Sequence, residues 1–185
     1  MNVYDFDKTI FDGDSTAKFY LFSLKRHKKI FRLTFSLFGA VTKFYVFKKG
    51  TKTEFKETMY RFLSYCDIEK DVKDFWDINE SGIKKYYLAK KKDDDVIVSA
   101  SSEFLLEPIC KRLGIKHLIA SRVDPVTCKY IGKNCHGEEK VRRFREEFGN
   151  AEIENFYSDS HSDDPMANIS DHAYMIKGEK IEEWT

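Results

Sequence analysis

The sequence predicts an α/β fold, a Rossmann-like parallel sheet flanked by helices, with an inserted α-helical cap. From residue 93 onward, short apolar runs alternate with helical segments, which is typical of a parallel sheet covered by helices. Between about Ser15 and Lys92 the pattern is helical throughout and contains no proline. We therefore expect an α/β core domain formed by residues 1–14 and 93–185, and a cap domain formed by residues 15–92.

The composition describes a folded globular protein. Of the 185 residues 42% are hydrophobic and 34% are charged, which is not the composition of a disordered chain. The net charge of +1 gives no reason to expect a nucleic-acid partner. The four cysteines show neither C-x-x-C nor zinc-ligand spacing, and no signal peptide is recognisable, so we expect free thiols in a cytoplasmic protein. Nothing in the sequence indicates an oligomeric state.

The core elements follow in a regular order. Residues 1–6 predict a short buried strand, and the apolar run 96–98 predicts a second one that ends in small hydroxyl residues. The segment 103–113 predicts a helix closed by Gly114. Residues 117–121 predict a third strand, followed by a small hairpin around Asp124 and Pro125.

The C-terminal part repeats the alternation. Residues 137–149 predict an amphipathic helix bounded by glycines, and residues 153–160 predict a strand that ends in acidic and hydroxyl groups. A short helix over 163–169 precedes what we expect to be the last strand, 172–176. The strands after residue 93 and the first strand are expected to form one parallel sheet.

Three predicted strands end in reactive side chains. Asp5 and Asp7 end the first strand, Ser99 ends the second, and Asp159 ends the strand near the C-terminus. In open α/β sheets ligands bind beyond the carboxyl ends of the strands, so these residues should meet at one edge. The sequence therefore predicts a site at that edge.

The residue types of this site point to phosphoryl transfer. Carboxylates gathered at one edge repel each other unless a hard cation lies among them, and Mg²⁺ suits such a cluster because it takes carboxylates, waters and phosphate oxygens. A serine hydroxyl, a lysine and helix N-terminal amides can hold a dianion. Charge neutralisation and positioning supply most of the rate in such sites. The set is Asp5, Asp7, Ser99, Lys140, Asp159 and Asp163.

Two positions in this set have neighbours of the same type. Lys133 lies near Lys140 in sequence, and we favour Lys140 because it falls in the first turn of a helix. Asp164 follows Asp163, and we favour Asp163 because it lies four residues after Asp159.

The motifs resemble those of a known family. DFDKT at 5–9 resembles the D-x-D-x-T signature of the haloacid dehalogenase superfamily of phosphohydrolases. The serine of VSAS, the lysine of GEEK and the acid pair of YSDSHSD resemble its second, third and fourth motifs, in the same order. The helical stretch between the first two motifs is similar to the cap of the phosphoserine-phosphatase-like branch. HGEEKVRRF and YSDSHSDDPM also resemble that branch, including bacterial phosphatidylglycerophosphate phosphatases.

The resemblance implies a role for each acid. Asp5 would attack phosphorus and form an aspartyl-phosphate. Asp7 would protonate the leaving oxygen and then deprotonate the hydrolytic water. Mg²⁺ would be bound by the carboxylates of Asp5 and Asp159 and the main-chain carbonyl of Asp7, with Asp163 acting from outside the first coordination shell or through water.

The resemblance also implies the phosphate cradle. Ser99 and Lys140 would hold the phosphoryl oxygens, and Thr9 would brace the loop after the first strand. The branch often has glycine at the positions of Lys8, Ala100 and Ser101. The backbone amides of Ala100 and Ser101 could still bind substrate, so these departures bear on substrate fit rather than on the chemistry.

The expected function is that of a magnesium-dependent phosphomonoester hydrolase. Its partner would be a small phosphorylated metabolite similar to phosphoserine, or alternatively a lipid phosphate head group, in which case the enzyme would be of the phosphatidylglycerophosphate phosphatase type. A non-catalytic receiver-like signalling domain, which also phosphorylates an aspartate, is the alternative from a different class. Receivers lack both a carboxylate two residues after the nucleophile and a long helical insertion, so Asp7 and the cap favour the enzyme.

The cap has an unusual charge pattern. No acidic residue occurs between Asp14 and Glu54, although this stretch is rich in lysine and arginine. It also contains an apolar, aromatic segment whose longest uncharged run, Leu33 to Thr42, is about half of the ~20 residues needed to span a bilayer. We expect either paired cap helices with their lysines in solvent, or a peripheral contact with the inner face of the membrane. The sequence leaves both open.

Overall fold

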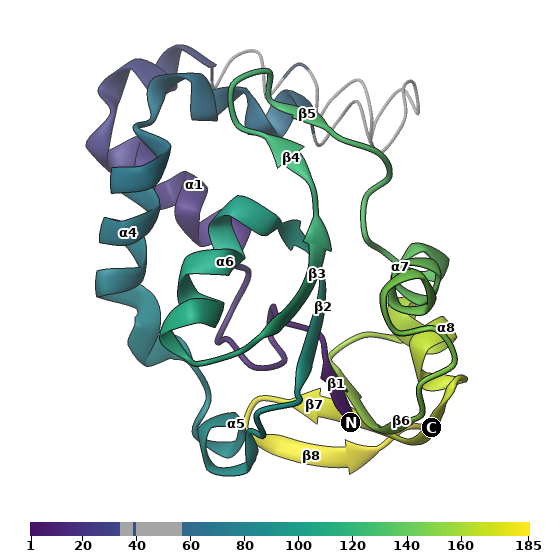
Figure 1. The fold of residues 1–185 in the computed structure, drawn as a ribbon. Coiled ribbons are helices and arrows are strands. Elements are labelled where there is room, and N and C mark those ends of the chain that lie inside the picture. The colour runs from purple at the N-terminus through teal and green to yellow at the C-terminus, as the bar shows by residue number, and fades with distance from the viewer. Residues whose placement is uncertain (34–38, 40–56) are drawn as a thin grey trace.

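The fold is a mostly parallel sheet covered by helices on both faces, as the sequence predicts (Figure 1). The computed structural model describes residues 1–33, 39 and 57–185. Its main sheet has the strand order β3-β2-β1-β6-β7-β8, and all neighbours are parallel except β7 and β8. The strands are β1 (Asn2–Tyr4), β2 (Val96–Ser102), β3 (His117–Ser121), β6 (Ile153–Ser158), β7 (Ser170–Lys177) and β8 (Lys180–Glu183). A separate small hairpin pairs β4 (Val123–Asp124) with β5 (Lys129–Tyr130), as expected.

The two faces of the sheet follow the side-chain alternation of its strands. Val3 and Val98 face helices α7 (Glu138–Phe148) and α8 (Asp164–Ala167), within one buried cluster. Tyr4 and Ile97, each one position away, belong to the cluster on the other face, which includes α6 (Glu103–Arg112). Because successive side chains of a strand point to opposite faces, both faces are apolar, as a doubly covered sheet requires. Figure 1 shows α6 on one side of the sheet and α7 with α8 on the other.

The helices of the predicted cap pack onto this core. They are α1 (Ser15–Arg26), α4 (Ile68–Asn79) and α5 (Lys85–Lys90), with the 3₁₀ turns η1 (Lys28–Ile30), η3 (Arg61–Tyr65) and η4 (Glu80–Gly82). Trp76 of α4 is completely buried, and its Nε1 donates a hydrogen bond of 2.7 Å to the Leu105 carbonyl of α6. Its ring also meets Phe6 and Phe11, which lie in the loop after β1. The described cap helices and the sheet therefore share one hydrophobic core.

The C-terminal edge differs from the prediction. The segment 172–176 is not the last strand, because β7 turns at Gly178 and pairs with β8. The residues of β8, KIEE, are half-buried or exposed and mostly charged. Only Ile181 of this strand packs against the core, so no apolar alternation marks it and the pattern used for the other strands cannot detect it.

The basic and apolar cap segment is described only in part. Lys28 and Lys29 are exposed at the end of α1, but residues 34–38 and 40–56, which hold most of the predicted apolar run, lie outside the described residues. In the part of the chain that the structure describes, no helix has the length and apolar character needed to span a membrane.

Candidate active site

A buried ion triad lies at the carboxyl edge of the sheet. Asp5 directly follows β1, and its backbone N–H donates to the Tyr157 carbonyl of β6 at 2.9 Å. Lys140, in the first turn of α7, donates from Nζ to Asp5 Oδ1 and to Asp163 Oδ2, both at 2.7 Å. The side chain of Lys140 is only 2% exposed, so one cation is held between two carboxylates away from bulk water.

The environment raises the pKa of Asp5 and of Lys140. Burial raises the pKa of Asp5 to about 7, and the positive charge of Lys140 opposes that rise. Burial also disfavours the charged form of Lys140, but the charges and hydrogen bonds of Asp5 and Asp163 outweigh it and raise the lysine's pKa. The lysine therefore stays protonated, and its charge favours the ionised form of Asp5.

Asp7 lies in a different environment, between the start of α1 and the end of β2. Its Oδ1 accepts the backbone N–H of Ser15 at 2.8 Å, and its Oδ2 accepts the Ser101 hydroxyl at 2.5 Å. Burial raises the pKa of Asp7, and the hydrogen bond from Ser101 lowers it in part. The side chain is thus fixed in direction and favoured in its protonated form, which suits a proton donor.

The sequence-predicted residues other than Thr9 and Ser101 line one cavity of about 290 Å³. Ser99 is buried at the end of the apolar part of β2, and its Oγ accepts the Ser101 backbone N–H at 3.1 Å. Thr9 lies behind the cavity, completely buried, with its hydroxyl 3.5 Å from Asp5 Oδ2. The structure therefore brings together residues that are up to 158 positions apart. The cavity is lined by Asp5, Asp7, Lys8, Asp14, Ser99, Ala100, His136, Lys140, Asp159, Ser160, Ser162 and Asp163.

The donor set of this cavity fits a hard divalent cation. Asp5 and Asp159 present carboxylate oxygens to the same space, and burial raises the pKa of Asp159, which a nearby cation would reverse. Asp163 Oδ2 is taken by Lys140 and by the Ser158 hydroxyl at 2.7 Å, while its Oδ1 is buried without a hydrogen bond to any described residue. All of these groups are oxygen donors, as Mg²⁺ prefers.

The structure shows which residue of each pair, Asp163 or Asp164 and Lys133 or Lys140, lies at the cavity. Asp164 turns away from the cavity, because its Oδ1 meets His161 Nδ1 at 3.1 Å and Trp184 Nε1 at 3.0 Å. Lys133 is exposed, in the segment before α7. Only Asp163 and Lys140, of the four, take part in the buried triad.

Three contributions were not expected from the sequence. Ser101 was expected to offer a backbone amide, but its hydroxyl binds Asp7. Ser158 holds Asp163 from the last position of β6. Lys84, 5% exposed, donates from Nζ to the carbonyls of Lys8 and Gly178 and so fixes the loop after β1. Lys84 lies in a run of ordinary lysines and tyrosines, and no sequence signal marks it.

The loop after β1 has an unusual backbone at Lys8. Its φ of +56° lies in the left-handed region, which glycine adopts at no steric cost. This conformation gives a physical reason why similar proteins often have glycine here. Burial raises the pKa of Asp159, and the positive charge of Lys8 opposes that rise.

A second cavity, of about 480 Å³, adjoins the first. The two share Asp7, Asp14 and Ala100. Asp14 also caps α1, because its Oδ1 accepts the Ala17 N–H at 2.8 Å. The described lining is otherwise mainly apolar and aromatic, and consists of Thr16, Ala17, Tyr20, Leu21, Met59, Tyr60, Phe62 and Ser101.

Comparisons with known proteins place the chain in a family. The profile of the family described as haloacid dehalogenase-like hydrolase matches residues 3–168. A Mycobacterium tuberculosis (strain H37Rv) protein named "Probable phosphatase Rv3661" is 36% identical over 93 residues, which are 45% of this chain and 31% of that protein. The chain thus spans about a third of that relative's length.

Solved structures share the fold. A protein of unknown function from Bordetella pertussis Tohama I superimposes with a TM-score of 0.72 at 20% identity, over 94% of this chain and 87% of that one. A phosphoserine phosphohydrolase-like protein from Francisella tularensis SCHU S4 gives 0.55 at 13% identity, over 94% and 86%. A phospho-aspartyl intermediate analogue of phosphoserine phosphatase gives 0.52 at 17% identity, over 92% and 83%.

The triad makes stability depend on Lys140. Replacing it by methionine leaves Asp5 and Asp163 buried without their cation, so Lys140→Met should lower the free energy of unfolding at neutral pH by about 3–5 kcal/mol. Without the lysine the folded-state pKa of Asp5 rises further above its unfolded value. The folded state then binds more protons, so the loss should be smaller at about pH 5 than at about pH 8.

Urea denaturation of wild type, Lys140→Met and Lys133→Met at both pH values measures this effect. Lys133→Met removes the same side chain from an exposed position and should leave stability nearly unchanged. Equal unfolding midpoints for the two variants would contradict the assigned role of the triad.

Proposed function

The chain belongs to the haloacid dehalogenase-like hydrolase family, and on that premise we propose that it is a magnesium-dependent phosphomonoester hydrolase with Asp5 as its nucleophile. One observation carries the proposal: two acids, two residues apart, lie in opposite environments. Burial raises the pKa of both, but Asp5 is paired with a buried lysine whose charge opposes the rise, while Asp7 has only neutral hydrogen-bond donors. Pairs of acids whose surroundings differ in this way divide into an ionised and a protonated partner.

Asp5 is suited to nucleophilic attack. The Lys140 ammonium favours the ionised form of its carboxylate, against the effect of burial, and fixes its direction through the 2.7 Å bond at Oδ1. Attack of an Asp5 oxygen on phosphorus forms a new O–P bond as the ester O–P bond breaks, which leaves the phosphoryl group on the carboxylate. Water then attacks phosphorus, inorganic phosphate leaves, and Asp5 is restored.

Asp7 is suited to move the proton in both steps. It gives its proton to the departing ester oxygen and takes one from the water that cleaves the aspartyl-phosphate. Its contacts with Ser15 N and Ser101 Oγ hold the carboxyl at the junction of the two cavities. A leaving group in the larger cavity and a phosphoryl group in the smaller one would therefore both lie beside it.

The remaining groups neutralise and hold the phosphoryl oxygens. Ser99, Ala100 and Lys140 line the smaller cavity, and the Ser101 backbone N–H donates to Ser99 Oγ. Asp5, Asp159 and the Asp7 carbonyl would hold Mg²⁺, with Asp163 behind them. When bound, the cation supplies charge neutralisation for the phosphoryl oxygens and for the crowded carboxylates.

The larger cavity bears on the substrate. A phosphoserine-like leaving group brings a carboxylate and an ammonium, and the described lining offers acids to the ammonium but no cationic side chain to the carboxylate. Tyr20, Leu21 and Phe62 instead offer apolar surface. We therefore infer that the leaving group has an apolar or aromatic portion, which is a property shared by small aryl or alkyl phosphates and by lipid phosphates.

The nucleophile assignment has a direct test. Asp5→Asn keeps the size of the side chain but removes its nucleophilic charge, so it should abolish magnesium-dependent release of phosphate from p-nitrophenyl phosphate. Circular dichroism should show that the variant remains folded. Wild-type protein with Mg²⁺ and beryllium fluoride should form a stable adduct on Asp5, detectable by ¹⁹F NMR. Undiminished turnover by the Asn variant would refute the mechanism.

A second pair of variants separates proton transfer from metal binding. Asp7→Asn keeps the main-chain carbonyl, so it should lower turnover by ~10²–10⁴-fold with little change in the magnesium concentration needed for half-maximal rate. Asp159→Ala should raise that concentration, and chelation of Mg²⁺ should abolish wild-type activity. If both variants had the same rate and the same magnesium dependence, the roles would be wrongly assigned.

The substrate inference predicts a difference between leaving groups. Leu21 is 55% exposed and lines the larger cavity, so Leu21→Ser should lower kcat/KM for an octyl phosphate by about 10-fold and leave that for phosphoserine unchanged. Leu88→Ser makes the same change at an exposed leucine of α5 and should alter neither value. Comparing micellar with monomeric alkyl phosphates distinguishes a lipid surface from a soluble substrate. A preference of the wild type for phosphoserine would overturn the inference.

A further inference from the structure

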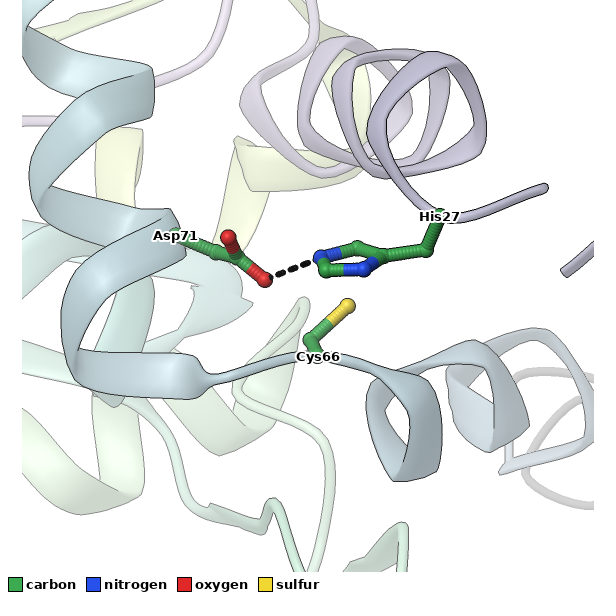
Figure 2. A group of neighbouring side chains, drawn as sticks. All are labelled: His27, Cys66 and Asp71. Atoms are coloured by element: carbon green, nitrogen blue, oxygen red, sulfur yellow. Dashed lines mark hydrogen bonds and ion pairs between the residues drawn. The ribbon is translucent and has the colours of Figure 1, made fainter. Parts of the chain in front are cut away.

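Three side chains of different chemistry converge in the cap, and none of them is among the residues that line the two cavities. His27, Cys66 and Asp71 come from three separate segments, yet their donor atoms all lie within 4.8 Å of one another. Figure 2 shows the imidazole, the thiol and the carboxylate pointing toward a common centre, with the His27–Asp71 contact drawn as a dashed line. These atoms are a nitrogen, a sulfur and an oxygen.

The backbone holds each of these residues in place. His27 ends α1, and its N–H donates to the Ser23 carbonyl at 2.8 Å. Cys66 ends η3, with its N–H on the Leu63 carbonyl at 2.9 Å. Asp71 lies in the first turn of α4, and its backbone N–H donates to the Asp67 carbonyl at 2.7 Å. The three donors therefore sit on ordered helix ends and not on loop tips, so the group is largely formed before any ligand binds.

The carboxylate is oriented by neighbours outside the group. Asp71 is 1% exposed. Arg26 Nε lies 3.0 Å from its Oδ1, and the Asp67 backbone N–H donates to its Oδ2 at 3.0 Å. His27 Nε2 lies 2.6 Å from the same Oδ2, which therefore faces the imidazole and the thiol. Partners of this kind orient the ligands of metal sites from outside the first shell.

A buried hydroxyl also adjoins the cluster. The Ser23 side chain is completely buried. Ser23 precedes His27 by four positions on α1, so the two share a helix face. Burial raises the pKa of the Cys66 thiol to about 11, and the contact with the Ser23 hydroxyl opposes that rise.

We propose that His27, Cys66 and Asp71 bind a transition-metal cation of the zinc class, with water in the fourth position. Imidazole and thiolate favour Zn²⁺ and Co²⁺ over Mg²⁺, and three protein ligands with one open position are a familiar zinc arrangement. Ligand atoms around a tetrahedral zinc lie about 3.3–3.8 Å apart. The present separations therefore need only side-chain adjustments, and the ion takes the place of the thiol proton and of the hydrogen bond between His27 and Asp71.

An ion bound at this site would connect the two cap helices α1 and α4. His27 ends α1, while Cys66 and Asp71 begin the segment that leads into α4. A bound ion would join these ends, and α1 is the helix whose first residue donates to Asp7. The site itself is independent of the proposed phosphatase function.

Cobalt gives a readout specific to this site. The purified full-length protein, freed of metals and reducing agents, is titrated with Co²⁺. A thiolate-to-cobalt charge-transfer band and the intense visible absorption of tetrahedral cobalt should saturate at one ion per chain, and Zn²⁺ should displace it. Oxygen donors of the catalytic cavity produce no thiolate band, so binding there is not mistaken for this site. Zn²⁺ should also raise the Tm.

Matched variants assign the ligands. Cys66→Ser should abolish the thiolate band, and His27→Gln should weaken cobalt binding at least 10-fold. Cys110→Ser changes a buried cysteine of α6 and should keep both the band and the affinity. All three variants should retain magnesium-dependent phosphatase activity. The absence of the cobalt site can therefore be distinguished from the absence of the proposed phosphatase activity. No thiolate band at millimolar Co²⁺, or a band that persists in Cys66→Ser, would overturn the proposal.

Discussion

One buried cation organises the catalytic edge of this protein. Lys140 is almost fully enclosed and lies 2.7 Å from both Asp5 and Asp163. Each of these charges would be costly to bury alone, so each requires the others in place. They come from α7, from the loop after β1 and from the turn after β6. The ion triad therefore fixes how one helix and two strands meet.

Asp7 is held in a different way, by uncharged hydrogen-bond donors instead of an ion pair. Asp7 is held by a backbone N–H and by a serine hydroxyl, and Ser15 and Thr16 of α1 also reach that hydroxyl, at 3.2 and 3.1 Å. One hydrogen-bonded cluster thus joins Asp7 to the start of α1 and to the end of β2. A shift of α1 would change the surroundings of Asp7, because the cap and the acid share these groups.

The protein holds two donor sets with different metal preferences. The catalytic cavity offers oxygen atoms, which suit a hard cation that keeps its waters and binds phosphate. The His27, Cys66 and Asp71 group offers nitrogen and sulfur, which suit a softer ion. Because the donors differ, the two ions would not compete for the same place. The first set would serve reaction chemistry, whereas the second would join helix ends.

The sequence by itself determined the parallel core and the residues at its edge, and tertiary packing decided how those residues interact. Strand ends in a parallel sheet share one edge, so Asp5, Ser99 and Asp159 could be grouped from their order along the chain. The hydroxyl contact of Ser101 and the carbonyl contacts of Lys84 were not predictable, since neither follows from spacing or periodicity. The strand β8 places one apolar side chain, Ile181, against the core, which is too little to form a pattern. The convergence of His27, Cys66 and Asp71 depends on how α1 meets α4, which local sequence does not encode.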